Sequence, residues 1–548
     1  MPDPIDPIEP TVPTVPTDPT VPTEIPEPTE TPERPTRFPD EGFGDADDDG
    51  RFVEDARPAR SRREGLRLAG VVGARFVTGL VAVAVIGVTV AAAAVLPLPG
   101  TRSKAPSEIV TPVPAAQRIV CPGGLLRLAD SEGKGASKAS TLGVPNVASA
   151  ATAGGVARTA LGGSDAGTGG TAAAPQVLST PPVNAGAKRS ILAGAQSQSI
   201  ATDEFFGLAS AACTAAVGDA WLVGGSTSTG RTTLLTLANP SAVPATVTVQ
   251  IFGENGAISA PGMNGIVIAA GGQRILSLAG FAPKLASPVV HVHSRGGQVI
   301  ANLEQSTVRG LEAGGIDFAA PETSARLSSV IPGVQLAGTQ TVQSRLGEEG
   351  FADLETVLRV YVPGTKGTTA HVSVLPEDPK ADGTAFEAQL EAGKVTDLPI
   401  DELVDGGYTV VVTTSVPVVS GVRVSTAGSA AVAQKTDFAW LGASPPLRSE
   451  ALVPIASGMI PIVHIQNPGK AAVTVKFHPL GATGTDSDLS LSVPAGSAAS
   501  IPVSPGAVYR ISGFSTVYAA VSGTTDGGVA GYAVYPSAPG SAPLRMYG

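Results

Sequence analysis

The chain has 548 residues and a formal net charge of −11, with 66 glycines, 48 prolines, 15% charged residues and 4% aromatic residues. The negative charge argues against nucleic-acid binding, because phosphate backbones require a cationic surface, and the glycine and proline content excludes a predominantly helical enzyme. The length predicts roughly three or four domains.

Residues 1–60 are rich in proline, threonine and acidic residues, and proline recurs at every third position from Pro4 to Pro22. Three residues per turn is the polyproline II period, so we expect a disordered cytoplasmic tail. The threonines could be displayed to a kinase, but a solvated spacer is the favoured interpretation. Asp45 to Gly50 resembles the start of an EF-hand loop, yet its twelfth position would be Ala56, so no calcium site is predicted.

Residues 76–96 contain no charge and no proline, and as a helix they would be roughly 30 Å long, the thickness of a bilayer's hydrocarbon core. Six arginines lie between residues 57 and 75, whereas only Arg102 and Lys104 follow closely. We therefore expect one transmembrane helix in the plasma membrane, with the N-terminus cytoplasmic and the C-terminal region extracellular. The basic juxtamembrane segment 61–75 suits anionic lipid head groups. A cleavable signal peptide and a buried core helix are the alternatives.

The only two cysteines, Cys121 and Cys213, both follow this helix. Outside the membrane such a pair predicts a disulfide, the alternative being two buried free thiols. Cys121 falls in a stalk and first strand at 97–130, and Cys213 falls in a resumed β region at 196–231. Between them, residues 131–195 are rich in alanine, glycine, serine and threonine, and we expect a flexible insertion.

The rest of the chain contains a threefold repeat. Each repeat begins with an alternating strand that enters a turn, typical of half-buried β structure. An Ala-Gly turn follows, and a short motif stands near the end of each repeat. The first strands are Leu235-x-Leu237-x-Asn239-Pro240, Leu358-x-Val360-x-Val362-Pro363 and Val463-x-Ile465-x-Asn467-Pro468, the turns are at Gly271, Gly393 and Gly496, and the end motifs are Asp317-Phe318-Ala319, Asp437-Phe438-Ala439 and Gly531-Tyr532-Ala533.

Roughly seven short strands in about 100 residues indicate Ig-like sandwiches, since solenoid and propeller repeats are shorter. The predicted fold is mostly β, with tandem Ig-like β-sandwich repeats at 232–320, 355–443 and 444–548 and a linker at 321–354. We expect the repeats to pack independently, with a partial fourth sandwich around the cysteines. The alternative is that neighbouring repeats share sheets in one larger assembly.

Several of these features occur together: Cys121-Pro122-Gly123, Trp221-Leu-Val-Gly-Gly225 after Cys213, and the Leu-x-Leu-x-Asn-Pro strand. With the single upstream helix, residues 70–548 resemble an uncharacterised family of single-pass cell-envelope proteins from actinobacteria. The resemblance implies an envelope location and no particular activity.

The sequence predicts no catalytic, cofactor or metal-binding residues. His291-x-His293 could supply half of a zinc site, but nothing nearby offers further ligands, so solvent-facing histidines are favoured. Asp317 and Asp437 occupy matching places in two repeats, and we expect them to cap turns, too far apart to act as a glycosidase pair. Trp221 and Trp440 are expected in cores, although either ring could stack a sugar. No serine or threonine has a recognisable histidine partner.

The sequence therefore favours a non-catalytic, membrane-anchored envelope protein whose β repeats bind a cell-wall polymer or an envelope protein. A transmembrane signalling subunit with a phosphorylatable tail is the second hypothesis. A hydrolase or transferase of wall glycans is the third.

Overall fold

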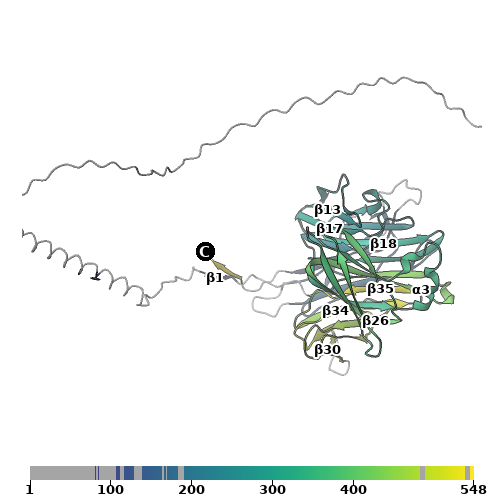
Figure 1. The fold of residues 1–548 in the computed structure, drawn as a ribbon. Helices are drawn as coiled ribbons and strands as arrows, with labels where there is room; N and C mark the ends of the chain where they lie inside the picture. The colour runs from purple at the N-terminus through teal and green to yellow at the C-terminus, as the bar shows by residue number, and fades with distance from the viewer. Residues whose placement is uncertain are drawn as a thin grey trace, which may run out of the picture. The chain divides into compact units, whose positions relative to one another are not determined.

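The computed structural model describes residues 81, 84–85, 107–110, 116–128, 139–162, 166–167, 170–182, 190–481, 488–536 and 544–547. β-Strands dominate these residues, which confirms the mostly-β prediction (Figure 1). The chain divides into two compact units, Met1–Arg102 and Ser103–Gly548.

The first unit is described at Val81, Ala84 and Val85, which are helical. The predicted disordered tail, the Asp45 to Gly50 run, the basic segment 61–75 and the remainder of the predicted transmembrane helix 76–96 lie outside the described residues. Among the residues that are described, no helix has both the length and the apolar character needed to cross a membrane.

In the second unit, the strands next to the disulfide form a β-sandwich that we call the cysteine sandwich. One of its sheets has the order β2-β8-β6, the other has the order β10-β9-β5, and β3, β4 and β7 form a short third sheet. The elements are β2 (Gln117–Cys121), β3 (Leu126–Leu128), β4 (Ala139–Thr141), β5 (Asn146–Ala151), β6 (Ala157–Ala160), β7 (Ala166–Gly167), α2 (Gly170–Ala173), β8 (Gln176–Thr180), β9 (Leu192–Ala201) and β10 (Phe206–Ala212).

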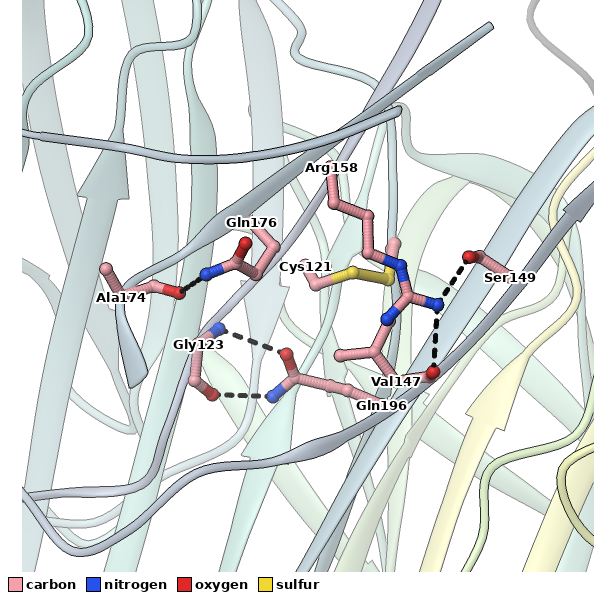
Figure 2. Close-up of a disulfide and its surroundings, with 9 residues drawn as sticks. Cys121, Gly123, Val147, Ser149, Arg158, Ala174, Gln176 and Gln196 are labelled. Atoms are coloured by element: carbon pink, nitrogen blue, oxygen red, sulfur yellow. Dashed lines mark hydrogen bonds between the residues drawn. A yellow bond between two sulfur atoms is a disulfide. The ribbon is translucent and has the colours of Figure 1, made fainter. Parts of the chain in front are cut away.

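The predicted disulfide joins Cys121, at the end of β2, to Cys213, just after β10, with the Cα atoms 4.1 Å apart. The Gln196 side chain bonds both backbone groups of Gly123 beside it, at 3.0 and 2.6 Å, as Figure 2 shows. Arg158 reaches from β6 to the carbonyl oxygen of Val147 on β5. The predicted fourth sandwich around the cysteines is therefore present.

The segment 131–195 departs from the expected flexible insertion, because strands β4 to β8 and the start of β9 lie within it. Leu178 and Ala195 are fully buried there. Its alternation is hidden in the sequence because alanine, serine and threonine occupy both buried and exposed positions, so hydrophobicity shows no period of two.

Three further sandwiches follow the cysteine sandwich, and we number them 1 to 3. Sandwich 1 contains β11 (Asp219–Val223), β12 (Arg231–Ala238), β13 (Ala245–Gly253), β14 (Gly256–Ile258), β15 (Ile266–Ile268), β16 (Gln273–Ser277), η1 (Leu278–Gly280), β17 (Val289–Gly296), β18 (Ile300–Arg309), β19 (Glu312–Ala319) and β20 (Pro321–Glu322).

Sandwich 2 contains β21 (Arg326–Leu336), α3 (Thr339–Leu346), η2 (Ala352–Leu354), β22 (Val357–Tyr361), β23 (Thr368–Pro376), β24 (Thr384–Leu390), β25 (Val395–Pro399), β26 (Gly406–Ala427), η3 (Ala430–Val432) and β27 (Thr436–Gly442).

Sandwich 3 contains β28 (Glu450–Pro454), β29 (Ile460–Gln466), β30 (Val473–Pro479), β31 (Leu489–Val493), β32 (Ala498–Pro502), β33 (Val508–Ser512), β34 (Tyr518–Thr525) and β35 (Gly528–Ala533). Two short strands outside the sandwiches, β1 (Ser107–Val110) and β36 (Leu544–Tyr547), pair antiparallel.

The three repeats share one topology. In sandwich 3 the sheets have the orders β28-β33-β30-β31 and β32-β29-β34-β35, and sandwich 1 repeats this plan with β11-β17-β13-β14 and β16-β12-β18-β19. In sandwich 2 the long strand β26 belongs to both sheets, because its first half pairs with β21 and β23 and its second half with β22 and β27. The predicted boundaries miss the first strand of two repeats: β11 lies before 232, and β21 lies inside the segment 321–354 assigned to a linker.

The turn motifs have direct structural roles. Asn239 is fully buried, and its Nδ2 donates to the carbonyl oxygens of Val243, Ile268 and Ala269, which ties the end of β12 to two loops. Asn467 does the same in sandwich 3. Gly271, Gly393 and Gly496 have φ values of 67°, 75° and 69°, a backbone conformation that favours glycine.

Removal of the disulfide tests how strongly it supports the fold. Closing a loop of 92 residues restricts the unfolded chain, so replacing both cysteines with alanine is expected to lower the free energy of unfolding by roughly 4–5 kcal/mol. Denaturant titration of oxidised wild type and the double variant measures the difference. Reduced wild type should match the variant, and a midpoint unchanged by either treatment would contradict the prediction.

Candidate functional site

A strand near the end of each sandwich meets counterparts in the other sandwiches. We call β10, β19, β27 and β35 the junction strands. β10 contacts β19, β27 and β35, while β27 also contacts β19 and β35. The end motifs of the three repeats, including Asp317, Asp437 and Gly531, lie in these strands. The repeated end motif therefore marks the strand through which each repeat joins the assembly.

Each junction strand also supplies side chains to a neighbouring hydrophobic core, and the order of the exchange is cyclic. Phe438 and Trp440 of sandwich 2 pack in the core of sandwich 1, and Val529 of sandwich 3 packs in the core of sandwich 2. Leu208 of the cysteine sandwich packs in the core of sandwich 3. Ile316 and Phe318 of sandwich 1 complete a cluster with residues of the cysteine sandwich.

Two packing modes are predicted from the sequence, independent repeats and repeats that share sheets, and neither describes the molecule fully. No described strand pairs with a strand of another sandwich, so the sandwiches do not share sheets. The cores are nevertheless completed by neighbours, so the sandwiches do not pack independently. The three repeats join one assembly because the core of each repeat includes side chains of a neighbouring sandwich.

Asp437 connects the junction strands by hydrogen bonds. Its carboxylate Oδ2 accepts from the backbone amides of Leu208 on β10, at 2.9 Å, and Val529 on β35, at 3.1 Å. Its Oδ1 accepts from the amide of Ile316 on β19, at 3.2 Å. One carboxyl group on β27 thus reaches every other junction strand.

Asp317 makes the complementary contacts from β19. Its Oδ2 accepts from the amide of Trp440 at 2.9 Å, and its Oδ1 accepts from the amide of Ser210 at 3.3 Å. Both aspartates are fully buried within strands. The prediction that they cap turns in separate domains is therefore wrong, because the topology brings the ends of distant repeats together.

Glycine makes room for the Asp437 carboxylate. A Cβ added at Gly315, whose φ is +114°, would lie 2.7 Å from Asp437 Oδ1, and one added at Gly207 would lie 2.5 Å from the same atom. Burial raises the pKa of Asp437 to about 7, although the amide donors act in the opposite direction. Burial likewise raises the pKa of Asp317 well above its usual range, and the neighbouring Asp437 raises it further.

A second buried polar cluster joins sandwiches 2 and 3. His464 Nδ1 lies 2.7 Å from Glu377 Oε2, and His464 Nε2 lies 2.6 Å from Ser522 Oγ. Serine, histidine and carboxylate in this order form the hydrogen-bond chain of a catalytic triad. The expectation that no serine has a histidine partner is therefore wrong. Sequence spacing could not reveal the cluster, since Glu377 belongs to a different sandwich from the other two.

This cluster differs from an active site because its side chains are not accessible to a substrate. The side chains of His464 and Glu377 are 0% and 2% exposed, and Ser522 is fully buried. Gly407 packs against both, because a Cβ there would lie 2.4 Å from Glu377 Oε2 and 3.4 Å from His464 Cε1. A substrate carbonyl cannot approach Ser522 Oγ in this arrangement, so the geometry fits a structural link between sandwiches.

Sandwiches 1 and 2 are joined by a cluster of arginines around Asp353. Arg309, Arg231 and Arg423 lie with guanidinium nitrogens 2.7, 3.0 and 3.2 Å from its carboxylate. Burial opposes ionisation of Asp353, but the three guanidinium groups outweigh burial and lower its pKa. Burial lowers the pKa of Arg423 to about 10. The interface between these sandwiches is therefore held by charge as well as by apolar packing.

All five histidines contact a carboxylate. His291 and His293 project from one strand as predicted, yet both reach Asp219, and no cluster suitable for a metal ion occurs among the described residues. The Trp221 ring is half-buried and stacks on His291 with centroids 3.9 Å apart, while Trp440 is buried. The four pairs besides the buried one are His291–Asp219, His293–Asp219, His371–Glu387 and His478–Asp488.

One surface cavity, of about 640 Å³, lies at the end of sandwich 2. Thr368, Thr369 and Ser415 line it together with Gln389 and Glu391. No junction aspartate and no member of the buried histidine cluster contributes to its lining.

Comparison with known proteins identifies a family whose model matches most of this chain. The model described as "Family of unknown function (DUF5719)" matches residues 150–504, from β5 to just beyond β32. No curated protein matches the chain. A solved structure titled "Biofilm associated protein - BSP domain" is 11% identical with a TM-score of 0.12, covering 64% of this chain and 65% of that one. The chain thus spans about 65% of the length of that structure, and at this TM-score no property is transferred from it.

Substitution of Gly315 tests the close approach to Asp437. Gly315→Ala adds a methyl group against Oδ1 and is expected to lower the free energy of unfolding by roughly 2–4 kcal/mol. Gly310 is the matched control, since it has a φ of +62° on the same hairpin and nothing within 4 Å of an added Cβ. Gly310→Ala should cost only about 1 kcal/mol. Equal losses measured by denaturant titration would show that backbone strain alone matters.

The buried histidine link is tested in the same assay. Glu377→Ala leaves His464 buried without its carboxylate, and we expect a loss of roughly 3–5 kcal/mol. Glu387→Ala is the control, because it removes the partner of His371 in a pair whose side chains are 60% and 67% exposed. That loss should stay below about 1 kcal/mol. The structural role is rejected if both variants unfold at the same denaturant concentration.

Proposed function

This chain belongs to the family of unknown function DUF5719, and we propose that it is a non-catalytic, membrane-anchored protein of the cell envelope. Its four sandwiches serve as one rigid scaffold that binds a wall polymer or an envelope protein outside the cell. The predicted helix at 76–96 holds the scaffold at the plasma membrane, with residues 1–60 in the cytoplasm.

The observation that supports a non-catalytic role most directly is the burial of the reactive groups. Ser522, His464 and Glu377 have the connectivity of a triad but lie between sandwiches with no exposed edge. Asp317 and Asp437 are equally buried and bond to backbone amides of neighbouring sandwiches. We infer that these groups stabilise the assembly, because side chains buried between sandwiches are not exposed to a substrate.

The Cys121–Cys213 disulfide supports the extracytoplasmic placement, since disulfides form and persist in oxidising compartments. The net charge of −11 disfavours a nucleic-acid partner. We expect binding at the outer faces of the sheets, because the inner residues are buried in contacts between the sandwiches.

A serine-directed reagent tests the proposal that Ser522 is inert. Full-length protein in detergent is treated with a fluorophosphonate, which reacts with accessible activated serines. We expect no adduct on Ser522 in the native protein by peptide mass spectrometry, and His464→Ala serves as the control for activation. An adduct on Ser522 in wild type that disappears in His464→Ala would overturn the non-catalytic assignment.

Location and binding are tested on intact cells that express the full chain. A membrane-impermeant lysine crosslinker should label sandwich residues such as Lys366 and Lys470 and attach them to wall material or envelope proteins. Cells permeabilised beforehand provide the comparison. Labelling only after permeabilisation would contradict the extracellular placement, and labelling without any captured partner would contradict the binding role.

A further inference from the structure

The junction of the four sandwiches contains two carboxyl groups with no cationic partner. Within the described residues neither Asp317 nor Asp437 takes part in an ion pair, and the hydrogen bonds that they accept come from backbone amides. An ionised carboxylate buried without a counter-charge is costly even when it is hydrogen-bonded. Two such groups close together also repel each other once both are ionised.

The other charged groups near these strands are engaged elsewhere. On the junction strands the remaining titratable side chains are Glu312, which pairs with Arg345, and Tyr532, whose hydroxyl donates to the Pro454 carbonyl. β10 has none. No side chain supplied by these strands can therefore neutralise the aspartates.

The charged groups of the elements packed against the junction have other partners. Arg309 on β18 pairs with Asp353 and donates to Thr436 Oγ1 and the Gly314 carbonyl oxygen, and Glu304, opposite Phe318 on the neighbouring strand, accepts from the Leu126 amide. Lys435 lies over the Phe206 ring. Arg423 and Arg359 lie over Phe438 and Trp440, side chains that point to the opposite face of β27 from Asp437, because alternate residues of a strand face opposite ways. Neutralisation of Asp317 or Asp437 therefore requires a proton.

We propose that Asp317 and Asp437 form a proton-controlled joint, in which the four sandwiches pack fully when at least one of the two carboxyl groups is protonated and loosen when both are ionised. Their amide donors come from all four sandwiches, so a change at this point reaches every interface. The buried histidine link and the disulfide keep the chain folded while the joint loosens.

The direction of the effect follows from proton binding. Burial raises the pKa of Asp437 to about 7, above the ordinary value of 3.8, and raises that of Asp317 as well. The packed form then binds more protons than the open form. The stability that this adds to packing is complete below about pH 4 and is lost as the pH rises through about 7.

Hydrogen exchange on the full-length wild-type protein tests the joint without any substitution. Protection of the amides of Leu208, Ile316 and Trp440 is measured between about pH 5.5 and about pH 8.5 and corrected for intrinsic exchange. We expect it to fall by about tenfold or more across this range, because one pKa unit corresponds to a tenfold change. The amides of Val249 and Val292, inside sandwich 1, should change much less. Equal changes in both groups would overturn the proposal.

Asn variants separate a titrating role from a structural one. Asp317→Asn and Asp437→Asn remove the ionisable group, so each should reduce the dependence of junction protection on pH, whatever it does to absolute stability. Asp219→Asn, at an exposed carboxylate, is the control and should keep the wild-type dependence. If either junction variant fails to fold, the other and the wild-type exchange profile decide. A junction variant with an undiminished pH dependence would refute the assignment.

Discussion

The structure depends on one carboxyl group placed where four β-sandwiches meet. Asp437 accepts hydrogen bonds from amides of β10, β19 and β35, and so fixes the three other junction strands relative to β27. Backbone amides in the middle of a strand normally bond to a neighbouring strand of the same sheet. Here the edges of separate sheets face one another, and a side chain provides the acceptors that a continuous sheet would have provided. The edge strands are thereby protected from pairing with other chains.

This arrangement constrains the sequence around it. The junction strands carry glycine at 207, 315 and 528, where any side chain would crowd the carboxylate or its neighbours. The junction strands also carry the large residues that fill the next sandwich, such as Trp440 on β27, whose Nε1 donates to Gln305 Oε1 of sandwich 1 at 2.8 Å. The core of each of the three repeats is then completed only when its neighbour has folded. A single repeat removed from the chain would expose part of its core, and its stability would fall accordingly.

The sequence predicts the parts of this fold that repeat locally. Alternation around Leu235, Val247 and Leu276 identifies strands correctly, and the glycine turns at 271, 393 and 496 are present because a positive φ is a local requirement. The cysteines identify the fourth sandwich and its disulfide. The strands of 131–195 escape prediction because small residues hide the alternation. The junction and the Ser522–His464–Glu377 link escape because their partners are set by tertiary packing, and local patterns contain no information about which repeat lies beside which.

The buried polar groups also help to determine which repeat packs against which. Three sandwiches with the same strand order and similar apolar edges could pack in several wrong sequences, since apolar contacts discriminate poorly between surfaces of similar size. Hydrogen-bonded groups discriminate well, because a mispaired edge leaves a buried carboxylate or amide without a partner. Asp317 and Asp437 occur in two of the repeats, whereas the third has Gly531 at the matching place, so the three edges are not interchangeable. The Glu377–His464 pair marks the contact between sandwiches 2 and 3 in the same way, and Asp353 with its arginines marks that between 1 and 2. Buried polar contacts between particular sandwiches thus distinguish the correct neighbours from the wrong ones.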